Sequence, residues 1–416
     1  MKLSKRTNMA KILISSIGTG NRENYNTANY EIDSKIYENE KFIASVLCKH
    51  IGIDKLFLVG TKDSIWEVVY EKFGGGDEME IYEARVKGEI GDFLSRIEDT
   101  IDKKLGTKGS KCFIIEYGLN DDELWANFDK FLQIAQNFAK NDEIYIDITH
   151  SFRSLSLMSF VMSEFISNSS DQELDIRGVY YGMFEYAKSN ENKTPIINLS
   201  IFFELLKWSK AIREFKNYGN AKELLALLEN LKDENKDIYN KFKSFSDSLS
   251  MSDLAYIQRS IPNLKTKISF FKDNHNNLYK LISKDLEKFI DTFDVQSLSL
   301  LQYKMAKWYC ENQNYSLGYI YLAEAFVSAV AEDNKLDPKN KDDRDKAKNI
   351  IKDKKEPKQS YKENEYNIYY KINDIRNYIA HALDLDNRYT QINPNQSIEN
   401  LPNYIKKVEI IFKNKK

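Results

Sequence analysis

Two hydrophobic rhythms follow one another along this chain of 416 residues, and the change falls near residue 200. Before that point, short unbroken apolar runs alternate with amphipathic stretches long enough to form helices. Unbroken apolar runs indicate strands covered on both faces, as in a mostly parallel sheet packed between helices. After that point, apolar residues recur at spacings of three and four, which is typical of amphipathic helices. The chain therefore predicts a doubly wound α/β domain at 1–200 and an all-α domain at 201–416.

The pattern also places individual elements. Strands are expected at 11–15, 55–59, 112–115, 144–148 and 178–181, and a further strand at 79–84. Helices are expected between them at 37–50, 64–73, 89–104, 122–140 and 154–167. In the second domain, the last long helices are expected at 298–312, 315–332, 366–383 and 402–412. The stretch 333–365 is dense in Lys and Asp, which predicts a solvated loop or a partly helical excursion.

Composition narrows the classes of function. The net charge is −2, so no bulk basic field marks the chain as a nucleic-acid binder, and any RNA contact is expected to be local. Three cysteines, Cys48, Cys112 and Cys310, are far apart and odd in number, which fits neither a disulfide framework nor a zinc site. No apolar stretch reaches about 18 residues. We expect a cytoplasmic protein without membrane contact, bound metal or cofactor.

The loop after the first strand begins Gly18-Thr19-Gly20-Asn21. Glycines permit a tight turn and a close approach of a ligand to backbone N–H groups. In open α/β sheets, ligands bind beyond the carboxyl ends of the strands, where the strand order reverses. A dinucleotide fingerprint would need a third glycine and a following acid, which this loop lacks. A nicotinamide-dependent enzyme and an ordinary strand-to-loop turn remain as alternatives.

A second loop leaves the apolar strand at 144–148 and enters a predicted helix. Thr149 and Ser151 can cap that helix, whose N-terminus presents N–H groups to an anion. His150 adds a donor or acceptor, and Arg153 can reach a phosphate or stack on a base. Neighbouring strands would bring the two loops together into a phosphate-and-base pocket. The alternative interpretation is a simple helix cap with a surface arginine.

Near the end of the chain lies the hexapeptide Arg376-Asn377-Tyr378-Ile379-Ala380-His381. A histidine can move protons near neutral pH, and an arginine can stabilise the charge that builds on a phosphate, so the pair can cut RNA. Five residues on an ideal helix separate Arg376 and His381 by about 140° around the axis. Two copies that meet across a two-fold axis would place both groups around one phosphate. An interfacial Arg and His without chemistry is the alternative.

This combination resembles the CRISPR-associated CARF–HEPN ribonucleases that accompany type III systems. The likeness in architecture spans nearly the whole chain, and it is specific at Gly-Thr-Gly after the first strand, at Asp-Ile-Thr-His-Ser-Phe-Arg and at Arg-Asn-Tyr-Ile-Ala-His. The resemblance implies a Rossmann-like CARF domain that binds a cyclic oligoadenylate across a homodimer. It also implies an all-α HEPN domain that acts as a metal-independent ribonuclease.

Family roles carry over to individual positions of this sequence. The resemblance implies a catalytic Arg376 and His381, with Asn377 as the polar residue that follows the arginine. It implies a cyclic oligoadenylate site, which we assign to Gly18, Thr19, Gly20, Asn21, Thr149, His150, Ser151 and Arg153. The family commonly has glycine where this chain has Ser151, and a Cβ there would crowd a closely approaching ring. The ring size, a tetra- or hexa-adenylate, therefore stays open.

The expected function is an endoribonuclease for single-stranded RNA, activated allosterically by cyclic oligoadenylate in type III CRISPR antiviral defence. The RNA 2′-hydroxyl would attack the phosphate, giving a 2′,3′-cyclic phosphate and a 5′-hydroxyl. The alternative is a regulator that senses the ring and has no nuclease activity. The first domain could in addition degrade its ring slowly, with Thr149 or His150 assisting; the residues do not decide this, nor the RNA base preference or any assembly beyond a dimer.

Overall fold

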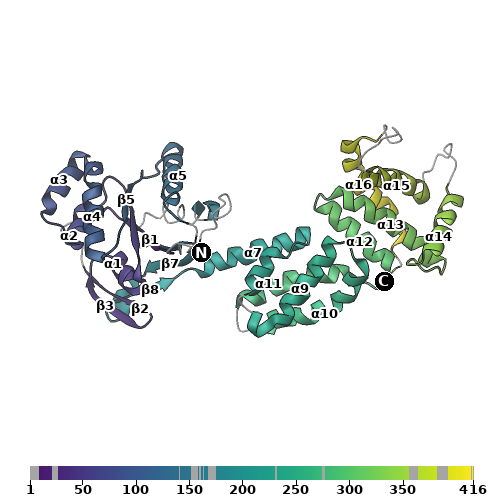
Figure 1. Cartoon of the computed structure of the whole chain (residues 1–416), viewed down its shortest axis with the longest axis horizontal. Coiled ribbons are helices and arrows are strands. Elements are labelled where there is room, and N and C mark those ends of the chain that lie inside the picture. Colours follow the sequence, from purple (N-terminus) through teal and green to yellow (C-terminus); the bar gives the residue numbers. More distant parts are fainter. Residues whose placement is uncertain are drawn as a thin grey trace, which may run out of the picture. The chain divides into compact units, whose positions relative to one another are not determined.

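The structure is a computed structural model that describes residues 9–20, 27–139, 141–150, 158, 161–162, 164–166, 175–229, 232–273, 277–355, 364–381, 392–413 and 415. The chain divides into two compact units, Met1–Glu204 and Leu205–Lys416. The first contains one eight-stranded sheet, and the described residues of the second form helices and no strand (Figure 1). An α/β Rossmann-like domain followed by an all-α region is therefore confirmed as the fold class.

The sheet of the first unit has the strand order β3-β2-β8-β7-β6-β1-β4-β5. Its strands are β1 (Lys11–Ile17), β2 (Ala28–Ile32), β3 (Lys35–Glu40), β4 (Lys55–Gly60), β5 (Lys111–Ile114), β6 (Glu143–Asp147), β7 (Asp175–Gly182) and β8 (Lys193–Asn198). Strands β5, β4, β1, β6 and β7 pair in parallel, so their carboxyl ends share one edge, here called the carboxyl edge. The five strands predicted from apolar runs are these five.

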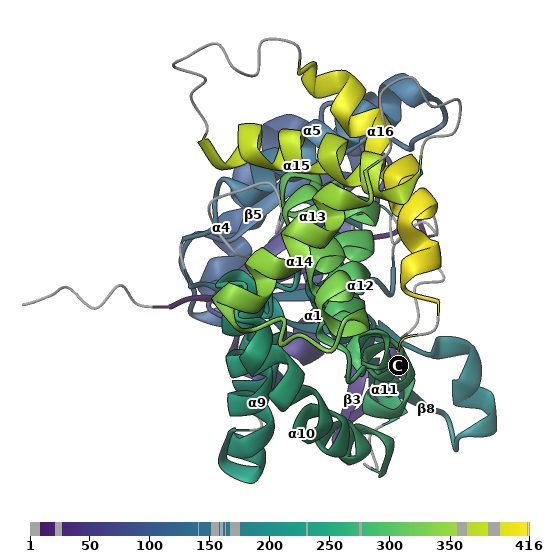
Figure 2. The same cartoon turned by 90° about the vertical axis from the view of Figure 1, so that its right-hand side faces the viewer.

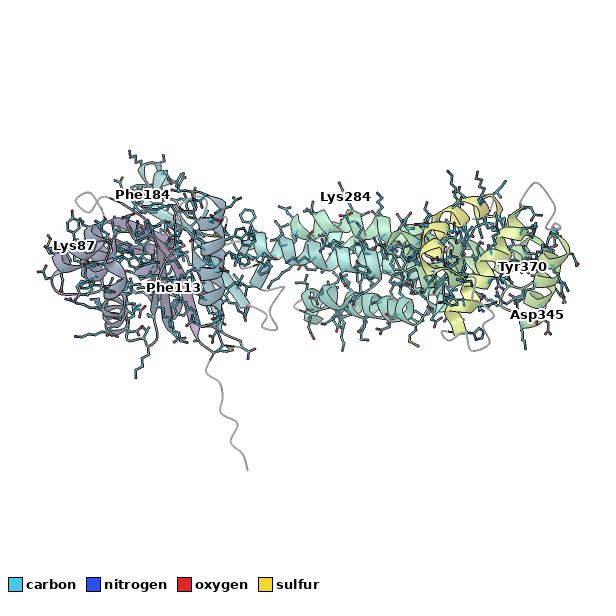
Figure 3. The ribbon with its side chains drawn as sticks, turned by 90° about the horizontal axis from the view of Figure 1, so that it is seen from above. Lys87, Phe113, Phe184, Lys284, Asp345 and Tyr370 are labelled. Carbon is cyan, nitrogen blue, oxygen red and sulfur yellow. The ribbon has the colours of Figure 1, made fainter. Side chains whose placement is uncertain are left out.

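Helices cover both faces of the sheet. Along β1, Leu13 packs into one core and Ile12 into another, and both side chains are fully buried. The Leu13 face is covered by α1 (Ile43–Leu47), η2 (Cys48–Gly52), α2 (Trp66–Lys72), α3 (Glu78–Lys87), η3 (Ile90–Phe93) and α4 (Leu94–Leu105). The Ile12 face is covered by α5 (Asp121–Ala135) and by Met162 and Ile166 (Figure 1). In Figure 3, Phe113 lies within this unit and Lys87 at its surface.

Two predictions in the first unit were wrong. The expected strand at 79–84 is part of α3, whose apolar Ile81 and Ala84 are buried at a spacing of three while Glu80 and Glu83 face solvent. The expected helix at 37–50 is helical only from Ile43, because β2 and β3 form a hairpin before it. The hairpin turn is made by Asp33 and Ser34, both with positive φ (48° and 63°), a conformation usually signalled by Asn-Gly.

After β7 the chain passes through η4 (Phe184–Ser189) into β8, the last strand of the sheet in chain order. The second unit is then built from α7 (Ile201–Tyr218), α8 (Lys222–Glu229), α9 (Lys232–Ser250), α10 (Leu254–Asp273), α11 (Asn277–Phe293), α12 (Leu298–Glu311), α13 (Tyr315–Asp333), α14 (Lys341–Asp353), α15 (Glu365–His381), α16 (Pro394–Val408) and η5 (Glu409–Ile411). Fully buried phenylalanines such as Phe215, Phe271 and Phe326 pack its core. Figure 2 shows α14 and α15 lying against α13, the helix that is buried along most of its length.

The last helices refine the expectations for the second unit. The Lys- and Asp-rich stretch contains α14, which Asn340 caps by accepting from the N–H groups of Asp342 and Asp343. Helix α16 begins eight residues before the expected Pro402, because Asn393 caps it and Pro394 occupies its first turn. Pro402 lies inside that helix rather than at its start. Among the described residues, none of the helices combines the length and apolar character that a membrane crossing requires.

Removing the carboxylate of Glu67 is expected to destabilise the first unit. Glu67 on α2 is fully buried, and its two oxygens accept hydrogen bonds of 2.9 Å from Arg85 on α3. Glu67→Ala leaves that guanidinium mostly buried without its carboxylate, so we expect the free energy of unfolding to fall by about 3 kcal/mol. The urea midpoint of the full chain measures this. Glu83→Ala on α3, whose pair with Lys87 is exposed, should leave the midpoint unchanged; equal losses in both variants would contradict the account.

Candidate functional site

The loops after β1 and β6 meet at the carboxyl edge. Strand β1 lies between β4 and β6, so the strand order reverses between β1 and β6. At that point a Cβ added to Gly18 would lie 3.2 Å from the carbonyl oxygen of His150. The structure thus brings together two of the loops that the sequence singled out. This is the position in which open α/β sheets bind their ligands.

Asp147 links the two strands that end at this junction. It is the last residue of β6 and is buried, with Oδ2 accepting from the Ser15 hydroxyl of β1 at 2.5 Å and Oδ1 accepting from the Thr149 N–H at 2.9 Å. Burial raises the pKa of Asp147, which nearby His150 and these two hydrogen bonds oppose. Burial also raises the pKa of the Cys48 thiol to about 12, with Asp147 adding to that rise. The carboxylate therefore has a structural part: it links the two strands and shapes the turn at Thr149.

Thr149 and His150 have different surroundings. The Thr149 hydroxyl accepts from the Gly182 N–H at the end of β7 at 2.9 Å, which ties the loop after β6 to the next strand. The His150 ring stands edge-on to Phe42, with centroids 6.2 Å apart. Burial lowers the pKa of His150, and Asp147 opposes that change. Burial thus favours the neutral imidazole over the imidazolium at this position.

The loop after β4 also belongs to this junction, although we did not predict it. Ser64 donates from its hydroxyl to the carbonyl of Ile17 at 2.9 Å, and the Ile65 N–H donates to the carbonyl of Gly18 at 3.1 Å. These bonds fix the backbone of the loop after β1. The sequence signal was present, since Ser64 follows an apolar strand and the turn residues Lys62 and Asp63.

The remaining predicted ligand residues divide into two groups. Thr19 and Gly20 are exposed on the loop after β1, where a ligand can reach them. Asn21, Ser151 and Arg153 lie outside the residues that the structure describes. Their part in the pocket stays a prediction.

The hexapeptide forms the last turns of α15. Arg376 donates from Nη1 to Oδ1 of Asn377 at 3.0 Å and from Nη2 to Oε1 of Glu324 on α13 at 3.2 Å. About a third of the Arg376 and Glu324 side chains is exposed (34% and 31%), so water screens this ion pair only in part. A guanidinium has five N–H donors, and the bonds to described residues use two of them.

Glu324 also binds a second arginine that we did not predict. Its Oε2 accepts from Nη2 of Arg344 on α14, and Arg344 donates further to the Ser328 hydroxyl and to the carbonyl of Pro338, both at 3.2 Å. We call the set Glu324, Arg344 and Arg376 the Glu324 clamp. Burial raises the pKa of the adjacent Tyr369 to about 12, with the Glu324 carboxylate adding to the rise. Because Glu324 and Arg344 lie 52 and 32 residues before Arg376, no local spacing could have revealed the clamp.

His381 ends the described part of α15 and is exposed to solvent. Within the described ranges, no hydrogen bond joins it to Arg376, in keeping with the predicted angle between them. The structure therefore brings Arg376 and Asn377 together and leaves His381 apart from them in one chain. Tyr370 of α15 and Asp345 of α14 mark this part of the second unit in Figure 3.

A curated relative covers nearly the whole chain. CRISPR-associated protein MJ1674 of Methanocaldococcus jannaschii is 33% identical to this chain over an alignment of 434 residues. The alignment covers 97% of this chain and 67% of the relative. The chain belongs to the CRISPR-associated CARF–HEPN family. The resemblance predicted from three short motifs is thus confirmed.

Two family profiles and a solved structure add detail. Residues 12–185 match the family described as CRISPR system endoribonuclease Csx1, CARF domain, so the sheet with its carboxyl edge is the CARF domain of this family member. Residues 204–298 match the family described as CRISPR-associated protein MJ1674, second domain. Csm6 of Enterococcus italicus, solved bound to cyclic hexa-2′-fluoro-hexa-dAMP, is 15% identical with a TM-score of 0.40, covering 97% of this chain and 93% of that one.

The Thr149 hydroxyl gives a test of how the ligand loop is held. Thr149→Val keeps the side-chain shape but removes the acceptor for the Gly182 N–H, a loss expected to cost about 1–3 kcal/mol. Amide hydrogen exchange at Gly182 should speed up correspondingly. Thr149→Ser retains the hydroxyl and serves as the matched control. Unchanged exchange in the valine variant would show that this hydrogen bond does not hold the loop.

Proposed function

We propose that this protein is a metal-independent endoribonuclease for single-stranded RNA, activated allosterically by cyclic oligoadenylate in type III CRISPR antiviral defence. The observation that carries the nuclease proposal is the partly exposed Arg376, which Glu324 and Asn377 anchor through two of its five donors among the described residues, on the same helix as an exposed His381. Membership of the CARF–HEPN family and the match of residues 12–185 to the CARF domain of an endoribonuclease support it.

The chemistry follows from the side chains. RNA carries its own nucleophile, the 2′-hydroxyl, so the protein needs only to move protons and stabilise charge. His381 takes the proton of the 2′-hydroxyl or protonates the leaving 5′-oxygen, and Arg376 binds the phosphate oxygens as their charge increases. Asn377 positions the guanidinium through its Oδ1. The products are a 2′,3′-cyclic phosphate and a 5′-hydroxyl.

A homodimer completes the active site in this proposal. In one chain, Arg376 and His381 lie about 140° apart around α15, so they cannot both face one phosphate without distortion. A two-fold axis brings a second α15 alongside the first and supplies the missing group from the partner copy. Residues 299–416 would then form the ribonuclease (HEPN) part and residues 204–298 a helical connector to the CARF domain.

Cyclic oligoadenylate is proposed to bind at the carboxyl edge. The loop after β4 is fixed to the loop after β1 by backbone and hydroxyl hydrogen bonds, and Gly18 comes close to the carbonyl of His150 in the loop after β6, which leaves the exposed Thr19 and Gly20 within reach of a ligand. Binding would shift the dimer toward the geometry in which both copies of α15 engage RNA, which is allostery in its thermodynamic sense. In the cell, the proposed site of action is the cytoplasm.

The alternative is a sensor of cyclic oligoadenylate without nuclease activity. The contact that favours it is the ion pair between Arg376 and Glu324, since a carboxylate already partners the arginine in the single chain. Slow degradation of the ring within the CARF domain, assisted by Thr149 or His150, would be compatible with either function.

Loss of His381 is expected to abolish RNA cleavage. His381→Ala removes the proton-transfer group and should lower kcat by about 10²–10⁴-fold on labelled single-stranded RNA, with cyclic oligoadenylate and EDTA present. Arg376→Ala should lose about 10²–10³-fold. Lys348→Ala, which removes an exposed cation from α14, is the control and should cleave normally. Ring-dependent cleavage that persists in His381→Ala would refute the catalytic assignment, and no cleavage by the natural chain would favour the sensor.

The ligand site is tested by thermal unfolding. Cyclic tetra- or hexa-adenylate at 100 times its Kd should stabilise the chain by about 2.7 kcal/mol, seen as a raised Tm, whereas NAD should not. Gly18→Val places a side chain against the His150 carbonyl and should remove most of the shift. The control is Gly76→Val, since a Cβ on Gly76 meets no atom within 4 Å. No shift with either ring would overturn the ligand assignment.

A further inference from the structure

A pocket of about 490 Å³ opens in the second unit beside the proposed catalytic helix. Its walls come from the end of α7, the turn between α12 and α13, the start of α13, α15 and the start of α16. Pockets for small ligands span about 300–1,000 Å³, so this one has room for a nucleotide-sized group. Every residue that lines it belongs to the unit Leu205–Lys416.

The lining is aromatic, rich in amides and uncharged. Four tyrosines line the pocket, among them Tyr315 and Tyr378, together with the consecutive amides of Asn312, Gln313 and Asn314. None of the described lining residues is acidic or basic. A pocket without a cation provides no counter-charge for a phosphate. Tyrosine rings with amide donors and acceptors are instead the groups that stack on a nucleobase and read its hydrogen-bonding edge.

The three amides keep hydrogen-bonding capacity for a ligand. Asn312 donates from Nδ2 to the carbonyl of Trp308 at 2.8 Å, which uses one donor and leaves its Oδ1 to accept. Asn314 caps α13 by accepting at Oδ1 from the Leu317 N–H, which leaves its Nδ2 to donate. Within the described chain, the exposed Gln313 side chain makes no hydrogen bond and has both groups to offer. Base edges present such mixed patterns of donors and acceptors.

The position of the pocket links it to the Arg–His pair. Tyr378 lines it three residues before His381, and Ile379 lines it three residues after Arg376. Helix residues three apart have Cβ atoms about 5–6 Å from each other. A group that contacts Tyr378 and Ile379 therefore lies about one helical turn from Arg376 and from His381. This separation is comparable to the distance between a phosphate and the base of its own or the next nucleotide.

We propose that this pocket binds one nucleobase of the RNA, next to the phosphate that is cut, and so sets the base preference of cleavage. This inference rests on the proposed nuclease function and identifies a specificity site for it. Gln313 hydrogen-bonds the base edge, and Tyr315 packs against its ring.

The test compares cleavage sites in a random-sequence RNA. The full chain, activated by cyclic oligoadenylate, should prefer one base at one position beside the cut by about tenfold, since a stacked and hydrogen-bonded base discriminates at this level. Gln313→Ala and Tyr315→Leu should reduce that preference below threefold and raise KM for the preferred RNA about tenfold, with kcat unchanged. Gln296→Ala and Tyr256→Leu, at exposed positions outside the pocket, are the matched controls.

A second measurement separates this inference from the nuclease proposal. Adenosine, guanosine, cytidine and uridine 5′-monophosphates are titrated into the full chain and followed by saturation-transfer NMR, which requires no cleavage. Base signals that disappear in Gln313→Ala support the pocket even where RNA is not cut. The pocket assignment is wrong if both pocket variants cleave RNA with unaltered base preference and no monophosphate gives a signal. The nuclease proposal is unaffected by that result.

Discussion

The burial of β1 on both of its faces determines the rest of the first unit. Ile12 and Leu13 are adjacent and fully buried, yet they belong to different cores. A strand with no solvent-facing side requires helices above and below, and the connections over them make its neighbours parallel. Parallel strands end at one edge, so the loops after β1 and β6 converge and Gly18 contacts the backbone of His150. The position of the proposed ligand site is thus a geometric consequence of an apolar strand.

In the second unit, the Glu324 clamp joins the helices around Arg376. One carboxylate bridges arginines on α14 and α15, so three helices are held in register at the point where Arg376 reaches solvent. The clamp fixes the direction of the Arg376 guanidinium, because Glu324 and Asn377 each accept one of its hydrogen bonds. In the proposed mechanism, the RNA phosphate binds beside Glu324, whose negative charge opposes phosphate binding until other RNA contacts compensate for it.

Local sequence patterns predicted most of the central strands and several of the long helices. Apolar runs located the five central strands, and the spacing of three and four located α12, α13 and α15, since both signals arise from burial of the residues themselves. The β2–β3 hairpin was missed because Asp33-Ser34 gives a weak turn signal, and α3 was misjudged because its apolar face is only two residues wide. Glu324 and Arg344 could not be found as site residues, because tertiary packing alone brings them to Arg376.

The central claim is that the helical unit cuts RNA through its own 2′-hydroxyl, with Arg376 and His381 in place of a metal ion. The chemical ends of the products test it most directly. Mass spectrometry of a defined single-stranded RNA, incubated with the activated protein in EDTA, should show fragments ending in a 2′,3′-cyclic phosphate and beginning with a 5′-hydroxyl. Fragments with 3′-hydroxyl and 5′-phosphate ends would contradict the mechanism, because they require attack by water on the phosphate.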